Sequence, residues 1–186
     1  MRERTPTGSG PLAGSLLLAH PSLREKTFRR SVILISAHDE NGAMGVVLNR
    51  PTGTLLGELT HDFALGPLAK VPIFRGGPVQ AEQLLLCGWK LHDDGAGFQL
   101  MFGIDPDRAI ELQAQPGVQL RAFLGYSGWS GGQLENELKQ NTWVVTPVVS
   151  GALSNPQDDR LWKTVLGNIS AEWKLLANEP EDVENN

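Results

Sequence analysis

The residues that come nearest to a catalytic motif are Gly125-Tyr126-Ser127-Gly128-Trp129. A serine hydrolase carries its nucleophile in the pattern Gly-x-Ser-x-Gly, where the last glycine allows a strained turn between a strand and a helix. Here that position is Trp129, and no histidine follows His92, although such hydrolases place their histidine after the serine. We therefore interpret the segment as a tight loop leading into a helix, with no nucleophile at Ser127.

Two other chemical patterns are incomplete. The segment Gly8 to Ala13 has the glycine spacing of a dinucleotide fingerprint, but no strand precedes it and no helix follows to receive the pyrophosphate. The only cysteine, Cys87, and four widely spaced histidines (His20, His38, His61 and His92) do not make a zinc quartet. We expect no cofactor and no metal, a partly exposed His38 at a hairpin end, and a buried Cys87.

Positive charge is concentrated in one cluster, made of Arg24, Lys26, Arg29 and Arg30. Such a cluster can contact an anionic partner, but it is more typical of a solvated loop edge. The net charge of −5 opposes general nucleic-acid binding, because phosphate contacts need a positive surface. We expect nucleic-acid binding to be weak or absent.

The composition is that of one ordinary globular domain. The chain has 186 residues, of which 40% are hydrophobic and 20% are charged. It has no apolar run of the length that spans a bilayer and no apolar export segment, and its single cysteine favours a reducing compartment. These features predict a cytoplasmic protein without membrane insertion, with a flexible N-terminal tail (1–13), one domain (14–178) and an acidic C-terminal tail (179–186).

The elements that must position any site are short strands mixed with short helices. Strands are predicted within 15–19, 32–36, 46–48, 73–74, 83–89, 98–102, 118–124 and 143–149. Helices are predicted within 55–63, 106–116, 131–140, 158–167 and 171–177. Asn41-Gly42 predicts a hairpin, Pro51 predicts the end of a strand, and Asp93-Asp94-Gly95 predicts a turn. Asp105 followed by Pro106 predicts a capped helix start. Without regular strand–helix alternation, this order favours an α+β fold with a mixed or antiparallel sheet.

Four residue strings, in this order, resemble the YqgE/AlgH family over 14–173. They are Gly42-Ala43-Met44-Gly45-Val46-Val47-Leu48-Asn49-Arg50-Pro51, then Gly76-Gly77-Pro78, then Gly125 to Trp129 followed by Gly132-Gln133-Leu134-Glu135, and finally Asp159-Arg160-Leu161-Trp162. Glu25-Lys26 and Ser127 depart from the residues that are usual in the family.

The resemblance implies a fold and leaves the function open. The implied fold is a mixed, bifurcated β-sheet rolled into a pseudo-barrel, with helices packed outside. Members are often described as transcriptional regulators because of a genetic link to alginate production. The first hypothesis is therefore a non-enzymatic binding or regulatory protein. A direct or indirect transcriptional regulator and an enzyme of unknown chemistry are the alternatives.

A candidate surface for an unknown protein or a small anionic ligand follows from the polar, glycine and aromatic residues of these motifs. Its residues are Asn49, Arg50, Gly76, Gly77, Tyr126, Trp129 and Gln133. Arg50 offers a planar fork for carboxylate or phosphate, and tyrosine and tryptophan are enriched at binding hot spots. The alternative is that these residues serve only the fold: the glycines make turns, Trp129 is core, and Arg50 pairs with Glu135 or Glu137.

Overall fold

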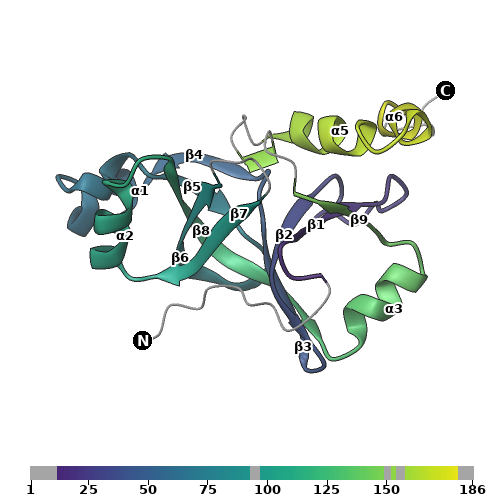
Figure 1. Ribbon diagram of the computed structural model, residues 1–186, viewed down its shortest axis with the longest axis horizontal. Helices are drawn as coiled ribbons and strands as arrows, with labels where there is room; N and C mark the ends of the chain where they lie inside the picture. The colour runs from purple at the N-terminus through teal and green to yellow at the C-terminus, as the bar shows by residue number, and fades with distance from the viewer. Residues whose placement is uncertain (1–11, 93–96, 149–151, 154–157, 180–186) are drawn as a thin grey trace.

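One branched, mixed sheet organises the protein, whose computed structural model describes residues 12–92, 97–148, 152–153 and 158–179 (Figure 1). Its nine strands are β1 (Ser15–Ala19), β2 (Val32–Asp39), β3 (Gly42–Val47), β4 (Pro51–Leu55), β5 (Pro72–Arg75), β6 (Val79–Leu91), β7 (Phe98–Ile104), β8 (Val118–Ser130) and β9 (Trp143–Pro147).

Short helices surround the sheet. They are α1 (Leu56–Leu59), the 3-10 turns η1 (His61–Phe63) and η2 (Pro67–Lys70), α2 (Pro106–Gln113), α3 (Gln133–Lys139), α5 (Asp159–Gly167) and α6 (Ala171–Ala177). Figure 1 shows α1 and α2 at one end of the molecule, α5 and α6 along the top, and α3 at the opposite end. The predicted capped start of α2 is confirmed, because the Asp105 side chain accepts a hydrogen bond from the Arg108 N–H.

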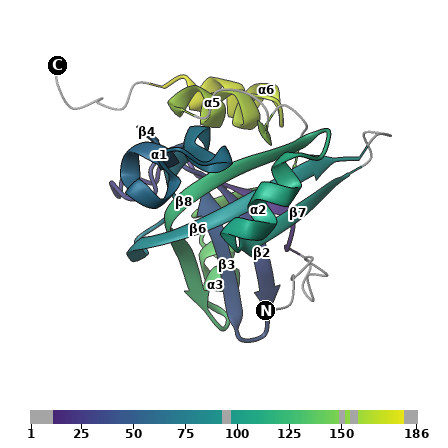
Figure 2. The same cartoon turned by 90° about the vertical axis from the view of Figure 1, so that its left-hand side faces the viewer.

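The sheet branches at β8, which confirms the α+β class with a bifurcated sheet. The first part of β8 lies between β5, which is parallel to it, and β6, which is antiparallel. Its last residues pair with β3, and the strand order continues through β2 and β1 to β9. The sheet curls strongly (Figure 2) but does not close into a true barrel.

The sequence predicted three details of these elements incorrectly. Residues 125–129 are not a loop before a helix but belong to the strand β8. Pro51 begins β4, an edge strand, where a missing N–H costs no ladder hydrogen bond. The helix expected over 55–63 is the four-residue α1 followed by a 3-10 turn. The hairpin at Asn41-Gly42 is confirmed, since β2 ends at Asp39 and β3 begins at Gly42.

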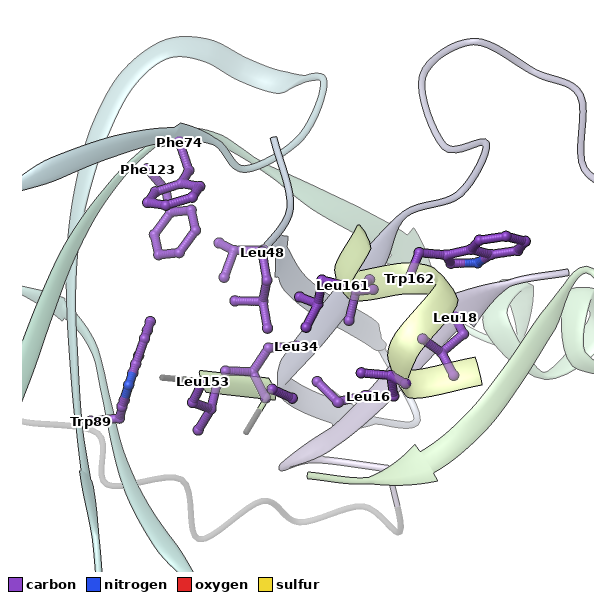
Figure 3. Close-up of a cluster of buried hydrophobic side chains, with 14 of the residues drawn as sticks. Leu16, Leu18, Leu34, Leu48, Phe74, Trp89, Phe123, Leu153, Leu161 and Trp162 are labelled. Carbon is purple, nitrogen blue, oxygen red and sulfur yellow. The ribbon is translucent and has the colours of Figure 1, made fainter. Parts of the chain in front are cut away.

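The core lies on both faces of the central strands. In β1, Leu16 and Leu18 face one buried cluster, and Leu17 faces another. The first cluster, drawn in Figure 3, reaches from Phe74 and Trp89 to Trp162 on α5. Because strands buried on both faces need apolar residues at every position, β1 and β2 read as continuous apolar runs.

The described part of the chain extends slightly beyond the predicted domain boundaries. Leu12 packs against the cluster around Leu17, and the Glu179 carbonyl accepts a hydrogen bond from Arg30. The predicted tails up to residue 11 and from residue 180, most of the dinucleotide-like segment and the turn at Asp93 to Gly95 lie outside the described residues. No described helix is both long and apolar enough to cross a membrane.

Candidate functional site

The second and third motifs meet at one backbone crossing. β5 runs beside one edge of β8, and the chain then passes over β8 at Gly77 and Pro78 to begin β6 on the other edge. The Gly76 N–H donates to the Leu124 carbonyl at 2.8 Å, and the Gly76 carbonyl accepts from the Val47 N–H at 2.9 Å. Gly76, which directly follows β5, therefore connects β5 to both β8 and β3.

Only glycine fits at this crossing. A Cβ on Gly77 would lie 2.2 Å from the carbonyl carbon and oxygen of Tyr126, and one on Gly76 would lie 2.3 Å from the Gly125 carbonyl oxygen. Gly125 has φ +69°, in the left-handed region, and an added Cβ there would lie 2.5 Å from the Gly77 carbonyl oxygen. Gly76, Gly77 and Gly125 thus serve the close approach of two backbones.

Asn49 and Arg50 lie next to this crossing, and their side chains bond to the segment that leads into β2. Asn49 is 1% exposed; its amide donates to the Arg30 carbonyl and accepts from the Val32 N–H. Arg50 donates to the carbonyls of Asn49 and Arg29.

The ion-pair partner of Arg50 differs from the two candidates that the sequence offered. Its guanidinium lies 3.5 Å from the Asp159 carboxylate at the start of α5, and neither Glu135 nor Glu137 is involved. Burial lowers the pKa of the Arg50 guanidinium, and Asp159 opposes that shift. Arg50 therefore connects the end of β3 to the α5 layer.

Trp129 and Gln133 belong to a clamp that fixes α3 on the sheet. The Glu137 carboxylate accepts hydrogen bonds from the indole N–H groups of Trp129 (2.9 Å) and Trp143 (2.7 Å) and from the Gln133 amide (2.9 Å). Trp129 is 7% exposed and packs edge-on against Trp143. Both candidates are thus engaged in holding the helix in place.

Next to the crossing, a groove of about 410 Å³ opens on the end of the sheet formed by β2, β3 and β8. This end projects at the bottom of Figure 1, where the β2–β3 hairpin and the end of β8 lie side by side. We call it the hairpin groove. Its lining residues are Ala37, Asp39, Asn41, Gly42, Ala43, Met44, Val79, Tyr126, Gly128 and Trp129.

The hairpin groove is apolar apart from its rim. Paired residues of neighbouring strands, Ala37, Met44 and Gly128, form a row across it, and Tyr126 and Val79 close one end. Asp39 is its only charged lining residue; the carboxylate accepts from the Asn41 N–H at 2.8 Å in the hairpin turn. Of the sequence candidates, the groove includes Tyr126 and Trp129.

Two further residues have an environment that the sequence did not predict. His38 is not partly exposed but 6% exposed, and its Nε2 lies 2.6 Å from Oε1 of Glu135. Arg121 is 7% exposed between the rings of Phe74 and Trp89. Its position is a signal available in the sequence, because a charged residue interrupts the apolar strand predicted at 118–124.

Arg121 has an incomplete set of partners within the described residues. One guanidinium nitrogen donates to the Leu153 carbonyl at 2.9 Å, and the other has no hydrogen-bond partner there. Burial lowers the pKa of the guanidinium to about 10. The two aromatic rings provide cation–π attraction, which partly offsets the loss of hydration.

The titratable and nucleophilic groups of the described residues do not converge on one point. The Ser127 hydroxyl is 0% exposed and donates to the Gly76 carbonyl at 3.1 Å. Cys87 is buried as expected, and burial raises the pKa of its thiol to about 12. No group of three or more potential metal-binding side chains occurs in the described ranges.

The fold and this site define a class: an α+β protein with a branched sheet, whose branches meet at glycine motifs and which carries a groove at one end. The chain belongs to the AlgH-like family, whose model matches residues 16–174. The resemblance to the YqgE/AlgH family is thereby confirmed.

Bacterial relatives match nearly the full length. A UPF0301 protein of Streptomyces coelicolor is 38% identical over 184 residues, covering 92% of this chain and 93% of its own. A UPF0301 protein of Xanthomonas campestris pv. campestris is 38% identical over 176 residues, covering 87% and 91%.

Two solved structures share the fold. The crystal structure of protein DIP2367 from Corynebacterium diphtheriae aligns with a TM-score of 0.71 and 25% identity, covering 92% of this chain and 94% of that one. The solution structure of AlgH from Pseudomonas aeruginosa aligns with a TM-score of 0.66 and 27% identity, covering 98% and 100%. None of these names specifies a reaction, so function has to be argued from the site.

Proposed function

We propose that this chain is a non-enzymatic binding protein and that the hairpin groove is its binding site. The observation that carries the proposal is an open, largely apolar hollow of about 410 Å³ whose lining contains aromatic area and one charge. Ligand sites commonly have volumes of about 300–1,000 Å³ and combine apolar walls with few polar groups.

The chemistry of the groove favours binding over catalysis. Its only carboxylate, Asp39, is exposed and hydrogen-bonded in a turn, and its lining contains no histidine, cysteine or serine. Ser127 lies nearby in β8 but is fully buried. The negative rim also makes a small anion a poor ligand here, so we narrow the partner to a neutral or basic group with apolar surface.

A variant at Gly128 tests the site. The atoms nearest to a Cβ there would be side-chain atoms of the Tyr126 ring at 3.4 Å and of Val79 at 3.7 Å, both at ordinary contact distance, so we expect an added side chain to enter the groove. Because β-branched residues favour strands, Gly128→Ile should fold at least as well as wild type while filling the groove. Gln99→Ile, at an exposed position of β7, is the matched control.

The measurement is a fragment screen by amide chemical-shift mapping. We expect apolar fragments to shift the amides of Ala37, Met44 and Gly128, and Gly128→Ile to weaken binding at least tenfold. Gln99→Ile and Arg50→Ala should bind as wild type. If shifts cluster instead around Arg50, or Gly128→Ile binds unchanged with a native melt, the groove is not the site.

A further inference from the structure

The groove lies along a strand edge that remains open past Tyr126. Pairing of β6 with β8 ends at Val79 opposite Tyr126, and β3 occupies only the other edge of β8 from Ser127 to Ser130. No other described strand pairs with β8 along the edge beyond Tyr126. Unpaired strand edges can pair with another chain.

Hydrogen-bond alternation shows which groups that edge presents. The Val47 N–H points to the β8 side of β3, where it donates to Gly76. Because the backbone N–H and C=O groups of every second residue point to the same edge of a strand, those of Gly45 and Ala43 also point toward β8. Their partners Ser127 and Trp129 therefore use their N–H and C=O groups toward β3. Gly128, between them, turns its N–H and C=O to the open edge.

Ser130 confirms this direction independently. Its N–H does not donate to β3 but to the Gln133 side-chain oxygen at 3.1 Å. The side chain of Gln133 thus occupies the place of a strand partner at the end of the edge. From Ser127 to Ser130 the open edge is about 14 Å long at roughly 3.4 Å per residue, enough for a short extended segment.

The side-chain environment beside this edge is selective. Gly128 leaves an apolar hollow between Tyr126, Val79 and Met44, which can receive an apolar side chain. Asp39 contributes the only charge of the lining, and the neighbouring Glu40 is also acidic and exposed. A partner that carries a lysine or arginine close to the apolar residue would match this charge.

We propose that the partner is an extended peptide segment of another protein, which adds to β8 as a strand. Its backbone pairs with Gly128, one apolar side chain fills the hollow, and a long basic side chain extends across the groove toward Asp39. This inference rests on the proposed function and deepens it: it names the class of partner. Strand addition of this kind takes affinity from main-chain hydrogen bonds and specificity from side-chain pockets.

Peptide selection is the first test. A random twelve-residue library displayed on phage is selected against the immobilised protein and counter-selected against Gly128→Ile. We expect enriched peptides with a β-branched or apolar residue and a lysine or arginine two positions away, on the same face of a strand. Enrichment of proline-rich or helix-periodic peptides, or of none, would overturn the proposal.

N-methylation then tests the backbone pairing in the best selected peptide. Methyl groups on every second amide block one edge of a peptide strand. Methylation of the set of amides that faces β8 should abolish binding, and methylation of the other set should leave the affinity within about threefold. The Gly128 amide should also exchange more slowly when the peptide is bound. Equal effects of methylating either set of amides would refute strand addition. The fragment screen would then still test the hairpin groove as a binding site.

Two substitutions test the remaining features. Asp39→Asn keeps an acceptor for the Asn41 N–H and removes the charge, so binding should weaken about two- to fivefold, the range of an exposed ion pair. Gln133→Ala frees the Ser130 N–H and should leave binding equal or tighter. Unchanged affinity in Asp39→Asn would remove the basic residue from the proposal, and a loss in Gln133→Ala with a native melt would contradict the edge geometry.

Discussion

Several polar side chains of the motif segments bond to backbone groups that the sheet leaves unpaired. The Asn49 amide donates to the Arg30 carbonyl and accepts from the N–H of Val32, the first residue of β2, and the Gln133 side chain accepts from the Ser130 N–H. Buried backbone groups must be paired, so a polar side chain at a strand end can be needed by the fold alone. Tyr126 differs, because its ring faces the groove.

The pair of His38 and Glu135 gives a pH-dependent contribution to stability. The hydrogen bond from His38 lowers the pKa of the Glu135 carboxyl from its ordinary 4.5. A lowered folded-state pKa stabilises the fold above the unfolded value, and the contribution is lost as pH falls through the folded value.

We expect Glu135→Gln to be less stable than wild type at pH 6, and the difference to shrink below about pH 4. Urea unfolding at the two pH values measures this. Glu82→Gln, at an exposed position on the strand β6, is the control and should show the same small difference at both. A difference for Glu135→Gln that does not change with pH would show that His38 prefers the ionised carboxylate no more than the amide.

Among the elements, β8 has the most connections, and the crossing over it determines how the two branches of the sheet meet. The crossing needs Gly77 and Gly125 on opposite sides of one close contact. Gly128, three residues further along β8, has no such restriction and faces the groove. Glycines of one motif therefore have different roles.

This difference predicts opposite outcomes for two alanine substitutions. Gly77→Ala places a methyl group against the Tyr126 backbone and should cost more than about 3 kcal/mol in the free energy of unfolding, if the protein folds. Gly128→Ala should change it by less than about 0.5 kcal/mol or stabilise slightly. Chemical denaturation compares them; similar losses in both would mean that the crossing is not the tight contact described.

For the whole molecule, β1 joins two of the three buried hydrophobic clusters of the described residues. Leu18 packs on the side of Trp162, and Leu17 packs on the side of Trp129 and Trp143. Because adjacent residues of one strand serve both clusters, neither cluster can lose its packing without disturbing the other. Small domains of this kind usually unfold in one step.

We expect Leu17→Ala and Leu18→Ala each to cost about 2–5 kcal/mol, with a single unfolding transition in both. Far-UV circular dichroism and tryptophan fluorescence, followed in urea, should give coincident curves. The melting temperature should fall by roughly 2–4 °C per kcal/mol in a chain of this size. Two separate transitions in either variant would show that the clusters are independent.

The sequence alone determined the local features. The hairpin at Gly42, the cap at Asp105 and the buried strands around Leu17 and Cys87 depend on turn residues, capping residues and apolar patterns within a few positions. The family resemblance was inferred from four motifs, and their order is likewise a property of the sequence.

The tertiary structure decided how these parts meet. Tyr126 to Trp129 form a strand rather than a turn because β3 and the Gly77 crossing hold them, and no local pattern shows that contact. Arg50 pairs with Asp159 and Arg121 lies between two rings because distant elements pack there. The groove and the open edge beside Gly128 exist only because β6 begins at Val79 and pairs with β8 no further than Tyr126. Where one strand leaves another unpaired depends on long-range pairing, which residue periodicity does not contain.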